Sequence, residues 1–117
     1  MSTTEPFVRW AGGKKWLIPY ISTIVGDLHI EHYHEPFLGG GAIYFSMEHS
    51  KKSYLSDANS QLINTYIQVR DNPEELIEYF KTLPNTEVDY YRIREEITRD
   101  NPVENAARFL YLNQTSY

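Results

Sequence analysis

Apolar side chains recur at intervals of three and four residues in six parts of this chain, a spacing typical of amphipathic helices. These parts are residues 15–25, 42–48, 59–70, 74–83, 90–98 and 103–117. Asp71-Asn72-Pro73 and Asp100-Asn101-Pro102 interrupt the pattern, because proline has no N–H to continue a helix. The pattern therefore predicts six helices, of which the last four follow one another without an intervening strand.

Two shorter segments are predicted to be β-strands. One ends at Glu35 and is followed by the glycines Gly39 to Gly41, after which a helix begins; the other spans residues 51–57 and ends at Asp57. Glycines at such a turn permit positive φ and let the backbone approach a ligand, and the following helix offers free N–H groups. A strand, a glycine turn and a helix in this order favour a nucleotide-like cofactor.

The position of Asp57 allows two interpretations. It follows Gly41 at close to the spacing at which parallel α/β folds place a carboxylate that accepts the ribose hydroxyls of a cofactor. Asp57 could equally cap the N-terminus of the helix that begins near residue 59. Both roles remain open at this point, and they can coexist.

The composition is that of a small folded protein. The chain has 117 residues, 41% of them hydrophobic, and fits one small domain or a piece of one. It has no cysteine, so a disulfide framework and a thiolate metal site are excluded, and a cytoplasmic location is expected. No apolar run approaches the ~20 residues of a membrane helix, so no membrane partner is expected.

The negative charge lies in the second part of the chain. Residues 1–70 contain six acidic and six basic residues, whereas residues 71–117 contain ten acidic and only five basic ones, which gives the net charge of −5. A surface that binds nucleic-acid phosphates should be basic. Composition therefore argues against nucleic acid as a direct partner of the second part.

Two further patterns could indicate a phosphate-binding loop and a metal site, but both match poorly. Gly12-Gly13-Lys14-Lys15 lacks both the upstream glycine and the Ser or Thr after the lysine that a nucleoside-triphosphate loop needs. His29, His32 and His34 lie close together, with His32 and His34 on one face of a strand, but no cysteine or spaced downstream histidine accompanies them. We therefore expect neither a phosphate loop nor a bound metal.

Four sequence blocks, in order and spacing, resemble the Dam-type DNA adenine-N6 methyltransferases, also called the D12 class. The blocks extend over nearly the whole chain from Phe7, and any one of them alone would be weak evidence. They are Trp10-Ala11-Gly12-Gly13-Lys14, Glu35-Pro36-Phe37-Leu38-Gly39-Gly40-Gly41, Ser56-Asp57-Ala58-Asn59 and Phe109-Leu110-Tyr111-Leu112-Asn113.

This resemblance implies an α/β fold and a methyl transfer from S-adenosylmethionine to the exocyclic amine of adenine in duplex DNA. Residues 1–70 would be the N-terminal part of a Rossmann-like S-adenosylmethionine-binding domain, and residues 71–117 the beginning of a helical target-recognition domain. The sheet would be incomplete, because parallel sheets normally have more than two strands. The residues implied to bind S-adenosylmethionine are Trp10, Lys14, Glu35, Gly39, Gly41 and Asp57.

The motif that receives the adenine amine in this family, Asp-Pro-Pro-Tyr, does not occur in these 117 residues. We therefore predict a truncated chain without catalytic residues of its own and inactive alone. A non-catalytic cofactor- or nucleotide-binding module, or one half of a split methyltransferase completed by a second polypeptide, remain alternatives.

Overall fold

The computed structural model describes residues 6–9, 13–25, 30–47, 52–95 and 100–115. The chain divides into two compact units, residues 1–58 and residues 59–117. The first unit mixes helices with a small parallel sheet, and the second contains only helices in its described part. The α/β class predicted from the sequence is thus confirmed.

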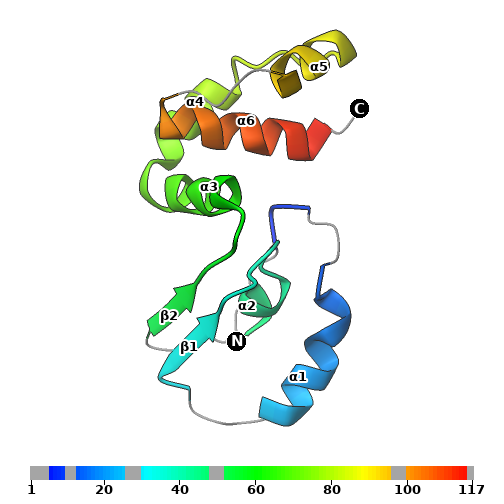
Figure 1. Ribbon diagram of the computed structural model, residues 1–117, viewed down its shortest axis with the longest axis vertical. Coiled ribbons are helices and arrows are strands. Elements are labelled where there is room, and N and C mark those ends of the chain that lie inside the picture. The colour runs from blue at the N-terminus through cyan, green and yellow to red at the C-terminus, as the bar shows by residue number, and fades with distance from the viewer. Residues whose placement is uncertain (1–5, 10–12, 26–29, 48–51, 96–99, 116–117) are drawn as a thin grey trace. The chain divides into compact units, whose positions relative to one another are not determined.

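The first unit is built around two parallel strands (Figure 1). β1 (His32–Glu35) pairs with β2 (Lys52–Leu55) in a register that sets His34 opposite Tyr54 and Glu35 opposite Leu55. In the described ranges, the helical segments that accompany the strands are the 3-10 turn η1 (Lys15–Leu17), α1 (Ile18–Val25) and the short α2 (Ala42–Ser46). Both predicted strands are confirmed: β1 ends at Glu35 as expected, and β2 ends at Leu55, two residues before the predicted end at Asp57.

The apolar core of the first unit is small. Val8, Leu38 and Ile43 are its buried apolar side chains among the described residues. The helix predicted at residues 15–25 is present, but it contains no buried residue, and Tyr20 and Ile24 from the predicted apolar stripe are exposed. Tyr20 and Ile24 are four residues apart and so share one face of α1.

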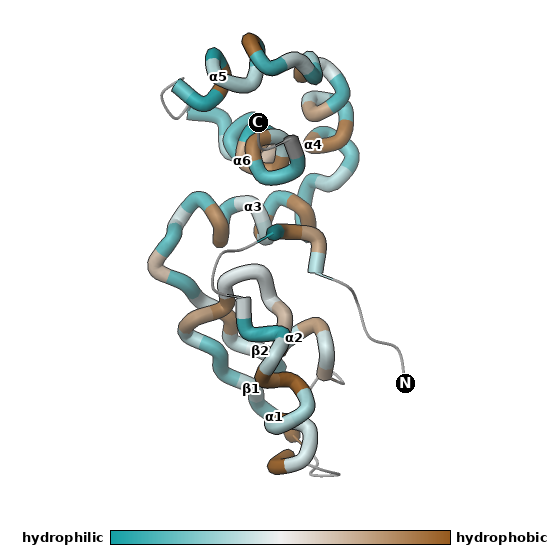
Figure 2. The backbone as a smooth tube through the Cα atoms, turned by 90° about the vertical axis from the view of Figure 1, so that its right-hand side faces the viewer, coloured by the Kyte–Doolittle hydropathy of each residue, from teal (hydrophilic) through white to brown (hydrophobic). Residues whose placement is uncertain are grey.

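The described part of the second unit is a group of four helices: α3 (Ser60–Asp71), α4 (Pro73–Phe80), α5 (Glu87–Glu95) and α6 (Pro102–Thr115). α6 packs against the other three, and apolar stretches of α4 and α6 lie side by side in Figure 2. One buried cluster joins α4 to α6 and another joins α5 to α6. Their buried members are Leu76, Ala106 and Ala107 in the first, and Tyr90, Ile93 and Tyr111 in the second.

Local signals define where these helices begin. Asn59 accepts a hydrogen bond from the backbone N–H of Leu62 at 3.1 Å, as a helix cap does. Pro73 occupies the first turn of α4, where its missing N–H costs nothing. α5 begins at Glu87, ahead of its predicted start at residue 90, because Thr86 caps it by accepting from the N–H of Asp89 at 3.2 Å. Its predicted end at residue 98 lies outside the described residues.

The boundary between the compact units lies between Ala58 and Asn59, ahead of the predicted division at residue 70. The reason is that α3 packs mainly against α6 and α4. Which functional domain each part belongs to remains a prediction. Among the described residues, no helix is long and apolar enough to cross a membrane.

Candidate cofactor-binding site

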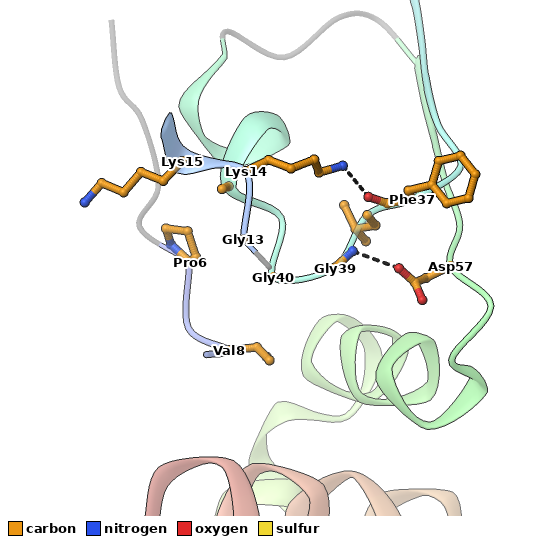
Figure 3. Close-up of a pocket in the computed structure, with 11 residues that line it drawn as sticks. Pro6, Val8, Gly13, Lys14, Lys15, Phe37, Gly39, Gly40 and Asp57 are labelled. Atoms are coloured by element: carbon orange, nitrogen blue, oxygen red, sulfur yellow. Dashed lines mark hydrogen bonds between the residues drawn. The ribbon is translucent and has the colours of Figure 1, made fainter. Parts of the chain in front are cut away.

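A pocket of about 410 Å³ lies in the first unit, beside the glycine turn (Figure 3). Three parts of the chain that are distant in the sequence line it. They are the N-terminal part with Pro6, Val8 and residues 13–15, the glycine turn with residues 37–40 and Ala42, and Asp57. Its volume falls within the ~300–1,000 Å³ typical of sites for small molecules. The pocket is therefore large enough for a cofactor of nucleoside size.

The glycine turn forms one wall of this pocket. Gly39 and Gly41 have φ values of 55° and 78°. This left-handed region is unfavourable for residues with a Cβ atom. The N–H of Gly41 donates to the carbonyl of Leu38 at 2.9 Å, which closes the turn just before α2. The sequence prediction that these glycines adopt positive φ is confirmed for both positions.

Backbone hydrogen bonds hold the turn against the end of the second strand. The N–H of Ser56 donates to the carbonyl of Glu35 at 2.9 Å, and the N–H of Leu38 donates to the carbonyl of Ser56 at 3.0 Å. The strand ladder thus continues beyond the last paired residues, Glu35 and Leu55. It brings Asp57 next to the glycines, although 18 positions separate Asp57 from Gly39.

The half-buried carboxylate of Asp57 points to the glycine turn. Its Oδ2 accepts a hydrogen bond from the N–H of Gly39 at 2.9 Å, and the side chain lines the pocket (Figure 3). The side-chain cap of α3 is Asn59 and not Asp57. Of the two interpretations left open by the sequence, the capping role therefore falls to the neighbouring asparagine.

A chain of three polar side chains joins Lys14 to the first strand. Lys14 Nζ donates to Glu35 Oε1 at 2.8 Å, and the hydroxyl of Tyr33 donates to Glu35 Oε2 at 2.8 Å. Lys14 Nζ also donates to the carbonyl oxygen of Phe37 (Figure 3). The side chain of Glu35 is only 7% exposed. A charge with so little access to water depends on such donors for its stability.

Burial, together with the hydrogen bond to Glu35 and its negative charge, raises the pKa of Tyr33 well above its ordinary value of 10.0. The hydroxyl therefore remains protonated, and a hydrogen-bond donor, over the whole neutral range of pH.

The structure gathers most of the site residues expected from the resemblance. Lys14, Gly39 and Asp57 line the pocket, whereas Glu35 forms an ion pair with Lys14 and Gly41 is the N-cap residue of α2. Trp10, the sixth, lies outside the described residues. That these residues bind S-adenosylmethionine is still a prediction.

Tyr33 was not identified from the sequence. The available signal was its place two residues before Glu35, because alternate residues of a strand share a face. The sequence gives Phe37 no role beyond its place in a motif. Its side chain is 75% exposed, and its carbonyl oxygen accepts a hydrogen bond from Lys14.

The opposite face of the sheet carries His32 and His34, both exposed and both stacked near the ring of Tyr54, at centroid distances of 6.2 and 4.5 Å. The prediction that the two histidines share a face is confirmed. His29 lies outside the described residues. No group of three metal-binding side chains occurs in the part of the chain that the structure describes.

The first unit has a glycine turn after β1, an acidic residue at the end of β1 and another just after β2, and a pocket beside the turn. This arrangement is typical of proteins that bind nucleotide-like cofactors. The family model of the D12 class N6 adenine-specific DNA methyltransferases matches residues 10–117, and the chain belongs to this family.

Curated relatives carry names of the same kind. The chain is 37% identical over 120 residues to the Type II methyltransferase M1.LlaDCHI of Lactococcus lactis subsp. cremoris, an alignment that covers 97% of this chain and 42% of the relative. It is 31% identical to the Type II methyltransferase M.MjaIII of Methanocaldococcus jannaschii, with 97% and 46% covered. It is 34% identical to the DNA adenine methylase of Escherichia coli, with 100% and 43% covered. The chain thus spans less than half the length of these relatives.

Proposed function

We propose that this chain supplies the S-adenosylmethionine pocket of a DNA adenine-N6 methyltransferase. The observation that carries the proposal is the pocket of about 410 Å³ in which Lys14, Gly39 and Asp57, distant in sequence, lie together. Membership of the D12 class and the names of the relatives support the same activity.

The polar groups at the pocket match the chemistry of S-adenosylmethionine. The ammonium of Lys14 suits the carboxylate at the amino-acid end of the cofactor, and the carboxylate of Asp57 suits the ribose diol. The turn at Gly39 leaves room for close approach of the cofactor, because a glycine has no Cβ atom. We assign Trp10, Glu35 and Gly41 to the same site, with Glu35 acting through Lys14.

The proposed reaction transfers a methyl group to the exocyclic amine of adenine, which S-adenosylmethionine makes possible by carrying that methyl on a sulfonium. Residues of this chain hold the cofactor and fix its orientation, which is the main contribution of the protein to such a displacement. The adenine must leave the duplex to be reached. The Asp-Pro-Pro-Tyr motif of the family, which would receive it, is absent from these residues.

It follows that the 117-residue chain should bind cofactor but should not methylate DNA alone. In this proposal the first unit is part of a Rossmann-like domain, and the helices from residue 71 onward begin the target-recognition domain. Duplex DNA is then a partner of the complete enzyme, whose further strands and target-recognition hairpin would come from sequence beyond the matched part.

Calorimetric titration of the chain with S-adenosylmethionine tests this proposal. We expect saturable binding that weakens about tenfold or more in Asp57→Asn, because a hydrogen bond to a charged group contributes ~1.5–3 kcal/mol. The matched control is Asp71→Asn, the same substitution at an exposed position in the second unit, which should bind like the wild type. A folded wild-type chain that shows no binding would overturn the proposal.

A labelled-methyl assay on adenine-containing duplex DNA tests the proposal that the chain alone does not methylate DNA. The chain alone should give no transfer, and transfer by the purified chain would contradict the assignment. The alternative is a split enzyme, in which a second polypeptide supplies the Asp-Pro-Pro-Tyr motif that these residues lack. It predicts that a second polypeptide carrying Asp-Pro-Pro-Tyr restores transfer when mixed with this chain.

A further inference from the structure

We propose that Tyr33 is a positioning residue for the cofactor: its hydroxyl orients the carboxylate of Glu35, which in turn fixes the ammonium of Lys14 at the pocket. This inference rests on the proposed function, since it concerns the amino-acid end of S-adenosylmethionine. Tyr33 itself does not line the pocket.

The carboxylate of Glu35 is held at both of its oxygens. Each of its two oxygens accepts one hydrogen bond at 2.8 Å, Oε1 from Lys14 and Oε2 from Tyr33. With both oxygens engaged, the carboxylate cannot rotate without breaking one of these bonds. The side chain is only 7% exposed. Water is therefore poorly placed to replace a lost donor.

Lys14 links the orientation of the Glu35 carboxylate to the pocket. Its ammonium has three N–H groups, and in the described part of the chain it donates to Glu35 Oε1 and to the carbonyl oxygen of Phe37. The lysine lines the pocket, with its side chain extended past the glycine turn towards Phe37 (Figure 3). Two fixed acceptors on the protein therefore determine the direction of the N–H that remains for a ligand.

A third observation concerns the tyrosine itself. Its ring lies 6.1 Å from the ring of Tyr44, measured between centroids, so the ring has a packing partner independent of the hydroxyl. A phenylalanine in its place keeps that ring contact and removes only the donor. The effect of the hydroxyl can thus be separated from the effect of packing.

The first experiment measures the affinity of wild-type chain and Tyr33→Phe for S-adenosylmethionine and for 5′-methylthioadenosine, which lacks the amino-acid end. We expect Tyr33→Phe to weaken S-adenosylmethionine binding about three- to tenfold, the effect of one hydrogen bond, and to leave methylthioadenosine binding unchanged. The matched control is Tyr54→Phe, the same change on the opposite, exposed face of the sheet, which should alter neither affinity.

A double-mutant cycle with Lys14→Met separates positioning from general structural damage. If Tyr33 acts through Lys14, Tyr33→Phe should have no further effect on S-adenosylmethionine affinity once Lys14 is methionine. Additive losses, equal losses for both ligands, or an unchanged Tyr33→Phe would overturn the inference while the proposed function stands. Absence of S-adenosylmethionine binding by the folded wild type would overturn both.

Discussion

Among the residues that the structure describes, buried apolar side chains are more numerous in the helical unit of residues 59–117, whereas the unit of residues 1–58 buries a charged carboxylate beside its site. Leu62, Ala106 and Ala107 have no exposed surface in the helical unit. The first unit leaves much of α1 exposed, and it connects Lys14 to Glu35 across 21 residues. Apolar packing therefore stabilises the helices, while backbone ladders and polar contacts hold the pocket.

The largest effect is expected from Leu62→Ala in α3. Leu62 is completely buried. The substitution removes apolar contacts and leaves a cavity, at a cost of about 3 kcal/mol in the free energy of unfolding. The control is Ile67→Ala on the same helix, at a position 37% exposed, which should cost about 1 kcal/mol or less. Urea unfolding followed by far-UV circular dichroism measures both, and equal losses would contradict an apolar core at Leu62.

The next effect concerns the buried carboxylate of the first unit. Glu35→Gln replaces the charge that Lys14 and Tyr33 both contact. The loss of that charge should lower the free energy of unfolding by about 2 kcal/mol. Glu31→Gln, at an exposed position just before β1, should change it little.

Both tryptophans, Trp10 and Trp16, belong to the first unit, so tryptophan fluorescence during urea unfolding reports it selectively. Tryptophan fluorescence therefore gives the free energy of unfolding of the wild type, of Glu35→Gln and of Glu31→Gln. If Glu35→Gln left the free energy of unfolding unchanged, the ion pair would contribute nothing to the stability of the first unit.

A smaller loss is expected at the start of α3. Asn59→Ala removes the side-chain acceptor for the N–H of Leu62 and should cost about 1 kcal/mol. Ser60→Ala, at the exposed first residue of the helix, is the matched control and should be near neutral. Chemical unfolding monitored by circular dichroism measures both variants. The assignment of Asn59 as the cap would fail if Ser60→Ala were the more damaging change.

The smallest effect is a loss of stability at alkaline pH that depends on Tyr33. Because its pKa is raised in the folded chain, the unfolded chain loses the proton first, near pH 10.0. The contribution of Tyr33 to folding stability is therefore fully present below about pH 10, and it is lost as the pH rises towards the higher pKa of the folded chain. Unfolding free energies measured at about pH 8 and about pH 11 should fall more in wild type than in Tyr33→Phe. An identical fall in both proteins would mean that Tyr33 ionises like an exposed tyrosine.

Features that depend on neighbouring residues were largely predictable from the sequence. Helical spacing and proline interruptions located the helices, and three glycines after a strand predicted the turn with positive φ. The alternation of His32 and His34 placed both on one face of β1. Each of these signals lies within a few residues of the structure it specifies.

Features that depend on distant residues were not predictable in the same way. The sequence left the capping role of Asp57 open, and the structure gives the cap to Asn59 while a 2.9 Å contact holds Asp57 to Gly39. The division after Ala58 depends on the packing of α3 against α6, far along the chain. The role of Tyr33 needed the position of Glu35 relative to Lys14, which no local pattern encodes.

The central claim, that residues 1–58 contain a cofactor pocket, is tested most directly by hydrogen–deuterium exchange of the chain with and without S-adenosylmethionine. Backbone amides that line a ligand site exchange more slowly when the ligand binds. We predict slower exchange at residues 13–15, 37–40 and 57, and unchanged exchange in α4 and α5. No protection in the first unit, or protection confined to the helices of the second, would contradict the account.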